Sequence, residues 1–417
     1  MNIFFAGIGG VGVGPLAQIT RDMGYTVAGS DVEASLMTEQ LEKQGVNIHV
    51  GPQDGSFLES TNSQQKIDWF VYTPAITENN PEFVMAKNLG IRMAKRPEFL
   101  AHAIEEKGLK LIAASGTHGK TTTTGMLIWV FQQLGIPVSY SIGTTISYGD
   151  SGHFDPTSEY FVYEGDEFDR SMLNFHPYLS LIPSLDYDHP DTYPAEQDYL
   201  EAFKTFAKQS QQLITWSDQH GDIYQGMENV KLLDKSSVDD NIKLAGLHNR
   251  QNATLIEVGL RQIGIDGNLA DILSNFPGTD RRFEKLADNL YSDYGHHPVE
   301  IASTLKMARE LSDHVVLVYQ PHQNIRQHQI KDDYTDQFEL ADEIYWLPTY
   351  ESREDPTLTM LKPEELIQKI TNKEHVHVAE FNDELWQIIQ TARDEGKLVL
   401  GMGAGAIDGW LRKQLKN

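Results

Sequence analysis

Short apolar runs alternate with longer amphipathic stretches along the whole chain, and this alternation predicts strands that alternate with helices. Strands are expected at residues 2–6 and 25–29, separated by a glycine-rich turn and a helix that ends near Met23. A further strand is expected at residues 67–72. This order is typical of an α/β fold in which helices cover a mostly parallel sheet.

The same alternation continues through two further segments. Their expected strands lie at residues 109–113, 160–163, 179–183, 289–292, 315–319, 344–347 and 398–400. Their expected helices lie at residues 125–134, 298–311, 363–370 and 383–394. We therefore expect three α/β domains, comprising residues 1–108, 109–275 and 276–417.

Composition narrows the class of protein. The chain has 417 residues, of which 40% are hydrophobic, so several domains with real cores are expected. It carries 60 acidic against 34 basic residues, and this net charge of −26 argues against nucleic acid or an anionic membrane as partner. The chain has no cysteine, which excludes disulfides and thiolate chemistry.

Location and assembly are constrained only weakly. No apolar run approaches the ~18 residues of a membrane span, so we expect no membrane insertion. Residues 1–5 predict a strand rather than a signal peptide. The absence of cysteine fits a reducing compartment, and we expect a cytoplasmic protein. A monomer and a homodimer both stay open.

The strongest chemical signal is a glycine- and threonine-rich run between the strand at 109–113 and the next helix. It reads Gly116-Thr117-His118-Gly119-Lys120-Thr121-Thr122. A strand, a Gly-Lys-Thr loop and a helix form the arrangement that binds the phosphates of a nucleoside triphosphate. Lys120 would supply a point charge, and the Thr121 hydroxyl would hold Mg²⁺. The strict pattern has glycine at position 114, where this chain has alanine; a turn without ligand is the alternative.

A second glycine-rich turn follows the first strand. Gly7, Gly9 and Gly12 match the fingerprint of a dinucleotide-binding loop, and Asp31 stands where a ribose-binding acid is expected. The pattern indicates a diphosphate at a helix N-terminus without identifying the nucleotide. An NAD-dependent oxidoreductase and a turn without ligand are the alternatives.

Acidic and histidine side chains follow two strands of the middle segment. Glu164 follows the strand at 160–163, and His189 comes shortly after the strand at 179–183. We expect these strands to be neighbours, so that the two side chains could hold a second Mg²⁺. An imidazole is an unusual ligand for this ion, and a solvated loop is the alternative.

Further polar clusters lie between residues 248 and 326, and each has an ordinary loop or surface position as its alternative. Adjacent histidines beside an aspartate indicate a site, amides suit a purine edge, and arginines suit phosphate or carboxylate. The candidates are Asp293 with His296, His248 with Asn249 and Asn252, Arg281, and Arg326.

All these motifs occur in one order, and over essentially the whole chain the sequence resembles the Mur ligase family. The resemblance implies a Rossmann-like N-terminal domain for a UDP-sugar, a central P-loop ATPase-type domain for ATP, and a Rossmann-like C-terminal domain for an amino acid. The run from Tyr294 to His297 favours the branch of the family that adds L-alanine over the branch that recycles a tripeptide.

The resemblance also implies roles for single residues. The UDP-sugar would be bound by Gly7, Gly9, Gly10, Gly12, Ser30 and Asp31. ATP would be bound by Gly116, Thr117, His118, Gly119, Lys120, Thr121, Thr122, His248, Asn249, Asn252, Arg281 and Asp293. Thr121, Glu164 and His189 would hold two Mg²⁺ ions, and the amino-acid pocket would include His296, Gln323 and Arg326. Lys120, Arg281 and His296 would be catalytic.

The implied reaction is an ATP-dependent amide ligation in peptidoglycan precursor synthesis. L-Alanine would be joined to the lactyl carboxylate of UDP-N-acetylmuramate through an acyl phosphate. Three departures bear on this: Gln323 stands where the family usually has arginine, Ser184 stands where it usually has asparagine, and the stretch Ala404-Gly405-Ala406 lacks the usual asparagine. The alternatives are a ligase for another amino acid or a recycled tripeptide, and a nucleotide-binding protein without ligase activity.

Overall fold

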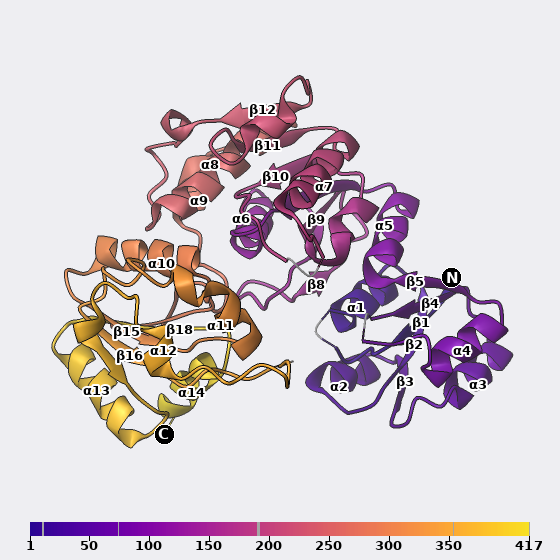
Figure 1. Cartoon of the computed structure of the whole chain (residues 1–417). Helices are drawn as coiled ribbons and strands as arrows, with labels where there is room; N and C mark the ends of the chain where they lie inside the picture. The colour runs from indigo at the N-terminus through magenta and orange to yellow at the C-terminus, as the bar shows by residue number, and fades with distance from the viewer. Residues whose placement is uncertain (11, 74, 190–191, 353, 417) are drawn as a thin grey trace. The chain divides into compact units, whose positions relative to one another are not determined.

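The computed structural model describes residues 1–10, 12–73, 75–189, 192–352 and 354–416. The chain divides into two compact units, and each contains its own sheet or sheets (Figure 1). The first unit comprises residues 1–238 and 252–273, and the second comprises residues 239–251 and 274–417. Among the described residues, every helix is too short or too polar to span a lipid bilayer.

Strands and helices alternate as the sequence predicts. The strands are β1 (Asn2–Ala6), β2 (Thr26–Asp31), β3 (Asn47–Val50), β4 (Trp69–Tyr72), β5 (Arg92–Lys95), β6 (Lys110–Ser115), β7 (Val138–Ser141), β8 (Gly152–His153), β9 (Tyr160–Gly165), β10 (Leu179–Ile182), β11 (Leu213–Trp216), β12 (Val230–Leu233), β13 (Glu284–Ala287), β14 (Leu290–Asp293), β15 (Val315–Tyr319), β16 (Glu343–Trp346), β17 (Val376–Val378) and β18 (Leu398–Met402).

The α-helices are α1 (Gly14–Asp22), α2 (Leu36–Lys43), α3 (Ser56–Gln64), α4 (Pro81–Asn88), α5 (Arg96–Glu106), α6 (Lys120–Gln133), α7 (Glu196–Gln209), α8 (Leu247–Gln262), α9 (Leu269–Ser274), α10 (Pro298–Leu311), α11 (Asn324–Ile330), α12 (Pro363–Leu366), α13 (Asp383–Asp394) and α14 (Ile407–Gln414). Short 3₁₀ helices are η1 (Phe168–Asn174), η2 (Gly221–Tyr224), η3 (Lys235–Ser237), η4 (Lys331–Asp333) and η5 (Lys373–His375).

The first sheet is parallel and has the strand order β3-β2-β1-β4-β5. Alternate residues of β1 enter two different cores, because successive side chains of a strand point to opposite faces. Ile3 and Phe5 pack with α1 and α5, whereas Phe4 and Ala6 pack with α3 and α4. Helices therefore cover both faces, and this leaves the carboxyl ends of the strands for a ligand.

The middle sheet has the order β12-β11-β10-β6-β9-β7-β8, and β8 is its antiparallel strand. β6 lies between β10 and β9. The expectation that Glu164 and His189 follow neighbouring strands is therefore wrong. The order of these segments along the chain did not show that β6 lies between β9 and β10 in the sheet.

The third sheet belongs to the second unit and has the order β13-β14-β18-β15-β16-β17. Its central strand β15 is buried along its whole length. Leu317 and Tyr319 pack with α10, and Val316 and Val318 pack with α13 and α14. β13 is antiparallel to β14, and the other pairs are parallel.

Two predicted helix bounds are wrong. The helix expected at 125–134 begins at Lys120, because residues Thr121–Thr124 continue the first turns despite their poor helix propensity. The helix expected at 363–370 ends at Leu366, since the chain turns there and buries Ile370 in the core. The three α/β blocks are confirmed, and the bounds at 108 and 275 stay a prediction.

Candidate active site

The loop between β6 and α6 is shaped by two glycines. Gly116 has a φ of +133°, and a Cβ at this position would lie 2.4 Å from the carbonyl oxygen of Ser184. Gly119 has a φ of +83°, and its Cβ would lie 3.1 Å from Nδ2 of Asn252. Glycine fits both positions because it lacks this atom. The loop therefore approaches neighbouring backbone closely and leads directly into the N-terminus of α6.

Polar contacts hold this loop to the segment after β10. The backbone N–H of His118 donates to Ser184 Oγ at 2.8 Å, and Ser184 Oγ donates back to the His118 carbonyl at 3.1 Å. The Thr117 hydroxyl lies 2.6 Å from the carbonyl oxygen of Asp186 and 2.7 Å from the hydroxyl of Tyr199. Ser184, which departs from the family pattern, thus supports the loop backbone.

The side chain of Lys120 folds back over the loop. Its ammonium donates to the carbonyl oxygens of Gly116 at 2.7 Å and Thr117 at 3.1 Å. It also lies 2.8 Å from Oε2 of Glu167, which is 1% exposed. Burial alone would lower the pKa of Lys120, but the charge of Glu167 outweighs burial and raises it. Lys120 is therefore a partly buried cation, with its side chain 17% exposed, held by its own loop and one carboxylate.

Glu167 also contacts His189. Nε2 of His189 lies 3.5 Å from Oε1 of Glu167. Burial would raise the pKa of Glu167, but Lys120 and then His189 lower it, so the carboxylate stays ionised. The pKa of His189 is raised, since its contact with Glu167 outweighs the opposite effect of burial. Glu167 therefore connects two residues that the sequence analysis treated separately.

Thr121 and Glu164 form the second polar contact of the site. The Thr121 hydroxyl donates to Glu164 Oε1 at 2.6 Å, and the backbone N–H of Gly143 donates to Oε2 at 2.7 Å. A hydroxyl beside a carboxylate is a donor set that suits Mg²⁺. Across the part of the chain that the structure describes, no group of three or more His, Cys, Asp or Glu residues is arranged to hold a metal ion.

Two further predicted residues lie close to this loop in the first unit. Asn252 on α8 is 5% exposed and adjoins Gly119. Thr122 lies in the first turn of α6. The structure therefore gathers Gly116 to Thr122, Glu164, His189 and Asn252 around one loop.

The N-terminal glycine loop is built in a similar way. Gly7 has a φ of +78°, and the N–H groups of Gly7 and Ile8 donate to the carbonyl of Ser30 at 2.8 and 3.0 Å. The N–H of Gly9 donates to Asp31 Oδ2 at 2.8 Å. A Cβ at Gly12 would lie 2.8 Å from Arg96 Nη1. Asp31 thus fixes the loop backbone in this structure.

Ser30 and Gly10 complete the predicted residues of this loop. The Ser30 hydroxyl donates to Oε2 of the fully buried Glu82 at 2.6 Å, and Gln53 Nε2 donates to Ser30 Oγ at 2.9 Å. The N–H of Gly10 donates to the Gly7 carbonyl at 3.1 Å. Burial raises the pKa of Glu82.

In the second unit, Asp293 ends β14 and is almost fully buried. Its carboxylate accepts hydrogen bonds from the N–H groups of Gly295 at 2.7 Å and Phe283 at 2.8 Å. Burial raises the pKa of Asp293 to about 6, although the nearby charge of Arg282 acts in the opposite direction.

His296 and Arg326 face each other in the same unit. Nη1 of Arg326 contacts Nε2 of His296, and Nδ1 of His296 lies 3.2 Å from the carbonyl of Tyr294. Burial lowers the pKa of His296 to about 4, so its ring is neutral at pH 7. Gln323 precedes α11 with a φ of +58°, and its N–H donates to the Tyr350 carbonyl at 2.8 Å.

Arg281 lies beside the loop after β18. Its Nη2 donates to the carbonyl of Gly403 at 3.3 Å, and its Nε lies 3.8 Å from Asp408 Oδ2. The guanidinium groups of Arg281 and Arg282 lie 4.6 and 5.2 Å from the ring centroid of Tyr294. Two cations thus adjoin the segment that carries His296.

His248 and Asn249 begin α8, and this part of the helix belongs to the second unit. Asn249 Nδ2 donates to the Ala245 carbonyl at 3.0 Å. Arg250 binds both carboxylate oxygens of Glu310 on α10, at 2.8 and 3.2 Å. Burial lowers the pKa of His248 to about 4. The predicted residues of this unit are therefore His248, Asn249, Arg281, Asp293, His296, Gln323 and Arg326.

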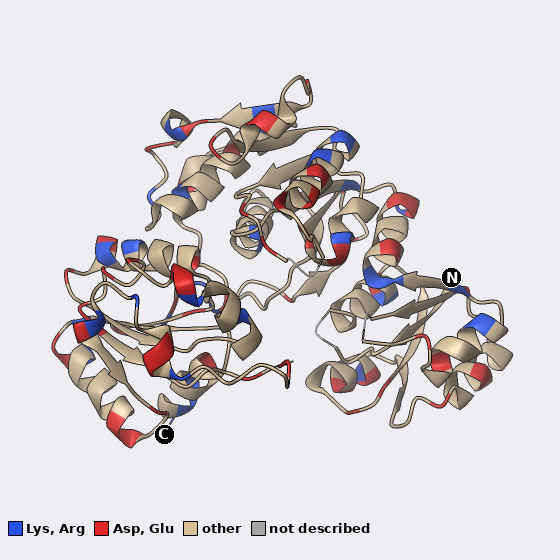
Figure 2. Cartoon of the chain, in the orientation of Figure 1, with Lys and Arg blue, Asp and Glu red and all other residues tan. Residues whose placement is uncertain are grey.

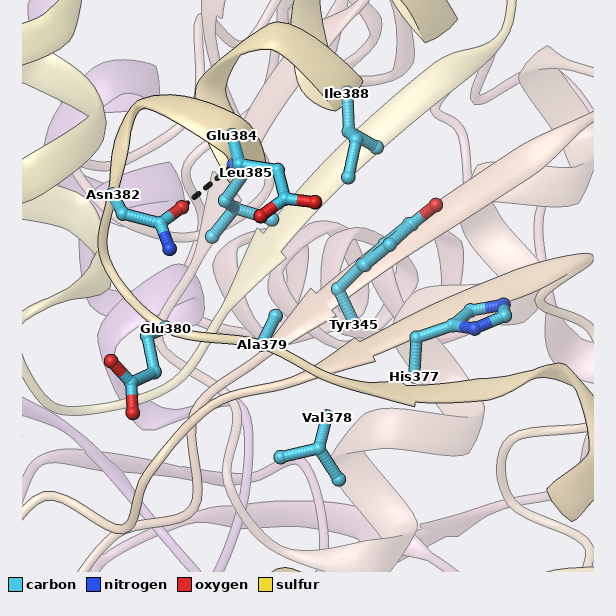
Figure 3. A pocket seen from close by; sticks show the side chains of 9 residues that line it. All are labelled: Tyr345, His377, Val378, Ala379, Glu380, Asn382, Glu384, Leu385 and Ile388. Carbon is cyan, nitrogen blue, oxygen red and sulfur yellow. Dashed lines mark hydrogen bonds between the residues drawn. The ribbon is translucent and has the colours of Figure 1, made fainter.

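A pocket of about 490 Å³ lies elsewhere, between strand β16, the edge strand β17 and the start of α13 (Figure 3). Its described lining consists of Tyr345, His377, Val378, Ala379, Glu380, Asn382, Glu384, Leu385 and Ile388. The rings of Tyr345 and His377 stack with centroids 5.3 Å apart. None of these lining residues is a predicted site residue.

Charge is not concentrated at the site. Figure 2 shows Asp and Glu in all parts of the chain, among both helices and loops. The acidic excess is therefore spread over the chain and is not a property of one site.

Glu167 is the residue that the sequence analysis missed. The signal was present, because Glu167 belongs to the acidic run after β9. The run alone did not show which carboxylate turns inward. Its partner Lys120 is 47 positions away in sequence.

A glycine-rich loop at the carboxyl edge of a sheet, followed by a helix and lined by a partly buried lysine, is typical of a nucleotide-binding α/β protein. Comparison with known families is more specific. Residues 2–107 match the catalytic domain of the Mur ligase family, residues 114–258 the Mur ligase middle domain, and residues 281–405 the Mur ligase glutamate ligase domain. The chain belongs to the Mur ligase family, which confirms the resemblance and replaces the oxidoreductase alternative.

Individual relatives agree with this assignment. The chain is 32% identical to the UDP-N-acetylmuramate–L-alanine ligase of Clostridium botulinum, over 97% of this chain and 95% of the relative. It is 29% identical to the enzyme of that name from Agathobacter rectalis, over 98% and 96%. The solved UDP-N-acetylmuramate–alanine ligase of Thermotoga maritima has the same fold, with a TM-score of 0.76, 23% identity and coverage of 100% and 98%.

Proposed function

We propose that this chain is an ATP-dependent ligase that joins L-alanine to the lactyl carboxylate of UDP-N-acetylmuramate. The observation that carries the proposal is the loop between β6 and α6, where the partly buried Lys120 stands at the start of a 14-residue helix and is paired with Glu167. The relatives that bear the name UDP-N-acetylmuramate–L-alanine ligase support the choice of substrates. The proposed role is peptidoglycan precursor synthesis in the cytoplasm.

The chemistry requires an activated carboxylate. Oxide is a poor leaving group, so the carboxylate oxygen first attacks the γ-phosphorus of ATP, and ADP leaves. The amine of L-alanine then attacks the acyl carbon, a tetrahedral intermediate forms, and inorganic phosphate departs with the carboxylate oxygen. The amine loses one proton, and the products are UDP-N-acetylmuramoyl-L-alanine, ADP and phosphate.

We propose that Lys120 and the loop from Gly116 to Thr122 bind the ATP phosphates. N–H groups at the start of α6 favour an anion, and the ammonium of Lys120 balances charge on the transferred phosphoryl group. Arg281 is proposed to act on the same group. His248, Asn249 and Asn252 are proposed to bind adenine, and Asp293 the ribose.

The contact between Thr121 and Glu164 fits Mg²⁺, because a hydroxyl and a carboxylate lie 2.6 Å apart beside the phosphate loop. Bound Mg²⁺ would neutralise phosphate charge and polarise the phosphorus. We propose Thr121 as a ligand of the first ion, and Glu164 with His189 as ligands of a second.

The remaining residues are assigned to the other two substrates. We propose that Gly7, Gly9, Gly10, Gly12, Ser30 and Asp31 bind the UDP-sugar in a domain of residues 1–108. His296, Gln323 and Arg326 are proposed to line the amino-acid pocket in a domain of residues 276–417, with ATP bound by residues 109–275. The neutral ring of His296 contacts Arg326, and we propose that it orients Arg326 for the incoming amino acid.

A second candidate is a ligase of the same type with another acceptor. Gln323 favours this second candidate, because glutamine cannot form the charged, bidentate contact that arginine makes with a carboxylate. The resemblance implies an arginine at position 323 together with Arg326. With Gln323 in place of the first, Arg326 alone would hold the acceptor carboxylate.

The test is release of phosphate from ATP in the presence of Mg²⁺ and UDP-N-acetylmuramate. L-Alanine, glycine, L-serine and the tripeptide L-Ala-γ-D-Glu-diaminopimelate are compared as acceptors. Release that requires the sugar nucleotide and is fastest with L-alanine supports the proposal. Release that occurs only with another acceptor replaces L-alanine as the substrate. No release of phosphate with any acceptor refutes the proposed ligase activity.

A further inference from the structure

One buried carboxylate serves two residues of the proposed site. The ammonium of Lys120 lies 2.8 Å from Oε2 and 3.0 Å from Oε1 of Glu167. The imidazole Nε2 of His189 lies 3.5 Å from Oε1 of the same group. The Glu167 side chain is 1% exposed, so solvent screens these contacts little. The proposed reaction assigns no role to Glu167.

The ammonium of Lys120 has no donor left for a phosphate. An ammonium has three N–H groups. In this structure, Lys120 Nζ is within hydrogen-bond distance of the Gly116 carbonyl at 2.7 Å, the Thr117 carbonyl at 3.1 Å and the Glu167 carboxylate. A phosphate oxygen that enters the loop must therefore replace one of these acceptors. Of the three, Glu167 carries a full negative charge and is the direct competitor of an anionic ligand.

We propose that Glu167 is a resident counter-ion that competes with the nucleotide phosphates for Lys120. When a phosphate oxygen replaces Glu167 as the acceptor of Lys120, Glu167 keeps its contact with His189. Lys120 and His189 then no longer share one carboxylate. Glu167 is thus a positioning residue that sets where Lys120 and His189 stand before the nucleotide binds. The inference rests on the proposed function, since it takes the ligand to be a nucleoside phosphate.

Glu167 could either compete with the nucleotide for Lys120 or only support the loop. These two roles predict opposite effects on nucleotide affinity when the charge of Glu167 is removed. If Glu167 competes, Glu167→Gln removes a negative charge from beside the phosphate position and nucleotide binds more tightly. If Glu167 only supports the loop, the same change loosens Lys120 and nucleotide binds more weakly. Glutamine has nearly the shape of glutamate, so Glu167→Gln changes the charge beside Lys120 and leaves the packing nearly unchanged.

The chain offers a matched control in the same two strands. Lys110 and Glu159 form an ion pair of 2.5 Å at the opposite end of β6 and β9, where Glu159 is 60% exposed. Glu159→Gln removes the same charge from the same sheet without touching the phosphate loop. We expect it to change nucleotide affinity less than about twofold.

The experiment measures binding of ADP by calorimetry without divalent metal, for the wild type and both variants. We expect Glu167→Gln to bind ADP about tenfold more tightly than the wild type. In the ligase assay, the same variant should have a lower KM for ATP and an unchanged kcat, because phosphate has already replaced Glu167 at Lys120 in the bound complex. A merely structural role would instead raise KM and lower stability together.

The outcomes separate the two proposals. A wild-type chain that binds no ADP refutes the proposed function. A wild type that binds ADP while Glu167→Gln binds it equally or more weakly refutes only the role of Glu167. Should Glu167→Gln fail to fold, Glu167→Asp moves the charge away from Lys120 by one methylene. It should then bind ADP about two- to threefold more tightly, and unchanged or weaker binding overturns the inference.

Discussion

Replacing Gly116 by alanine tests how the phosphate loop is held. The new Cβ would lie 2.4 Å from the Ser184 carbonyl oxygen, and the backbone φ of +133° is a conformation that side chains rarely adopt. Such backbone strain costs about 1–3 kcal/mol. Moving the strands apart would also weaken the hydrogen bond from Thr117 N to the Ser184 carbonyl, now 3.1 Å, at a cost of about 1 kcal/mol. We expect a total loss of about 2–4 kcal/mol.

The free energy of unfolding is measured by urea denaturation, with ADP binding as a second readout. Gly135→Ala is the control, because Gly135 follows the same helix α6 at a φ of +67° with no atom within 4 Å of its Cβ position. It should lose about 1–2 kcal/mol through conformation alone and keep ADP binding. If the two variants lose the same stability and both bind ADP, close backbone approach is not what shapes the loop.

Three further predictions follow from hydrogen bonds and burial. Ser184→Ala should destabilise by about 1–3 kcal/mol and weaken ADP binding, because the His118 N–H loses its partner at 2.8 Å; equal stability in urea would contradict this. The pKa of His296 is about 4 when folded, so the unfolded chain takes up its proton first as pH falls below 6.5. The free energy of unfolding, measured in urea, should then fall by about 3 kcal/mol between pH 6.5 and pH 4, and His296→Asn should reduce this pH dependence. A double-mutant cycle on Arg250 and Glu310, whose bidentate contact is partly exposed, should give a coupling of about 1 kcal/mol, and a value near zero would show no net contribution.

The sequence predicts best where one local pattern decides the structure. The expected strand 315–319 and the helices 298–311 and 383–394 have the predicted bounds in the structure. A short continuous run of β-branched and other apolar residues is typical of a strand buried on both faces, and a strong 3.6-residue period fixes a helix face. The loop between β6 and α6 could be predicted as a phosphate site for the same reason, because its residues are adjacent in the chain.

Prediction failed where the deciding contact is distant in sequence. The order of β10, β6 and β9 is set by which strands pair, and no local property of the segments that carry Glu164 and His189 specifies it. The start of α6 was missed because threonines favour strands, whereas here the loop and the core hold them in a helix.

The same distinction explains what the sequence says about the site. A motif such as Gly116 to Thr122 identifies groups suited to a phosphate, since those groups must be adjacent to meet one ligand. It does not identify the protein groups that occupy them when the ligand is absent. Lys120 meets Glu167 across 47 positions, and His118 meets Ser184 across 66. These contacts form only when strands β6, β9 and β10 come together in the sheet. The contacts of the loop are therefore a property of the fold, and we propose that a single carboxylate outside the motif determines how readily Lys120 accepts a nucleotide.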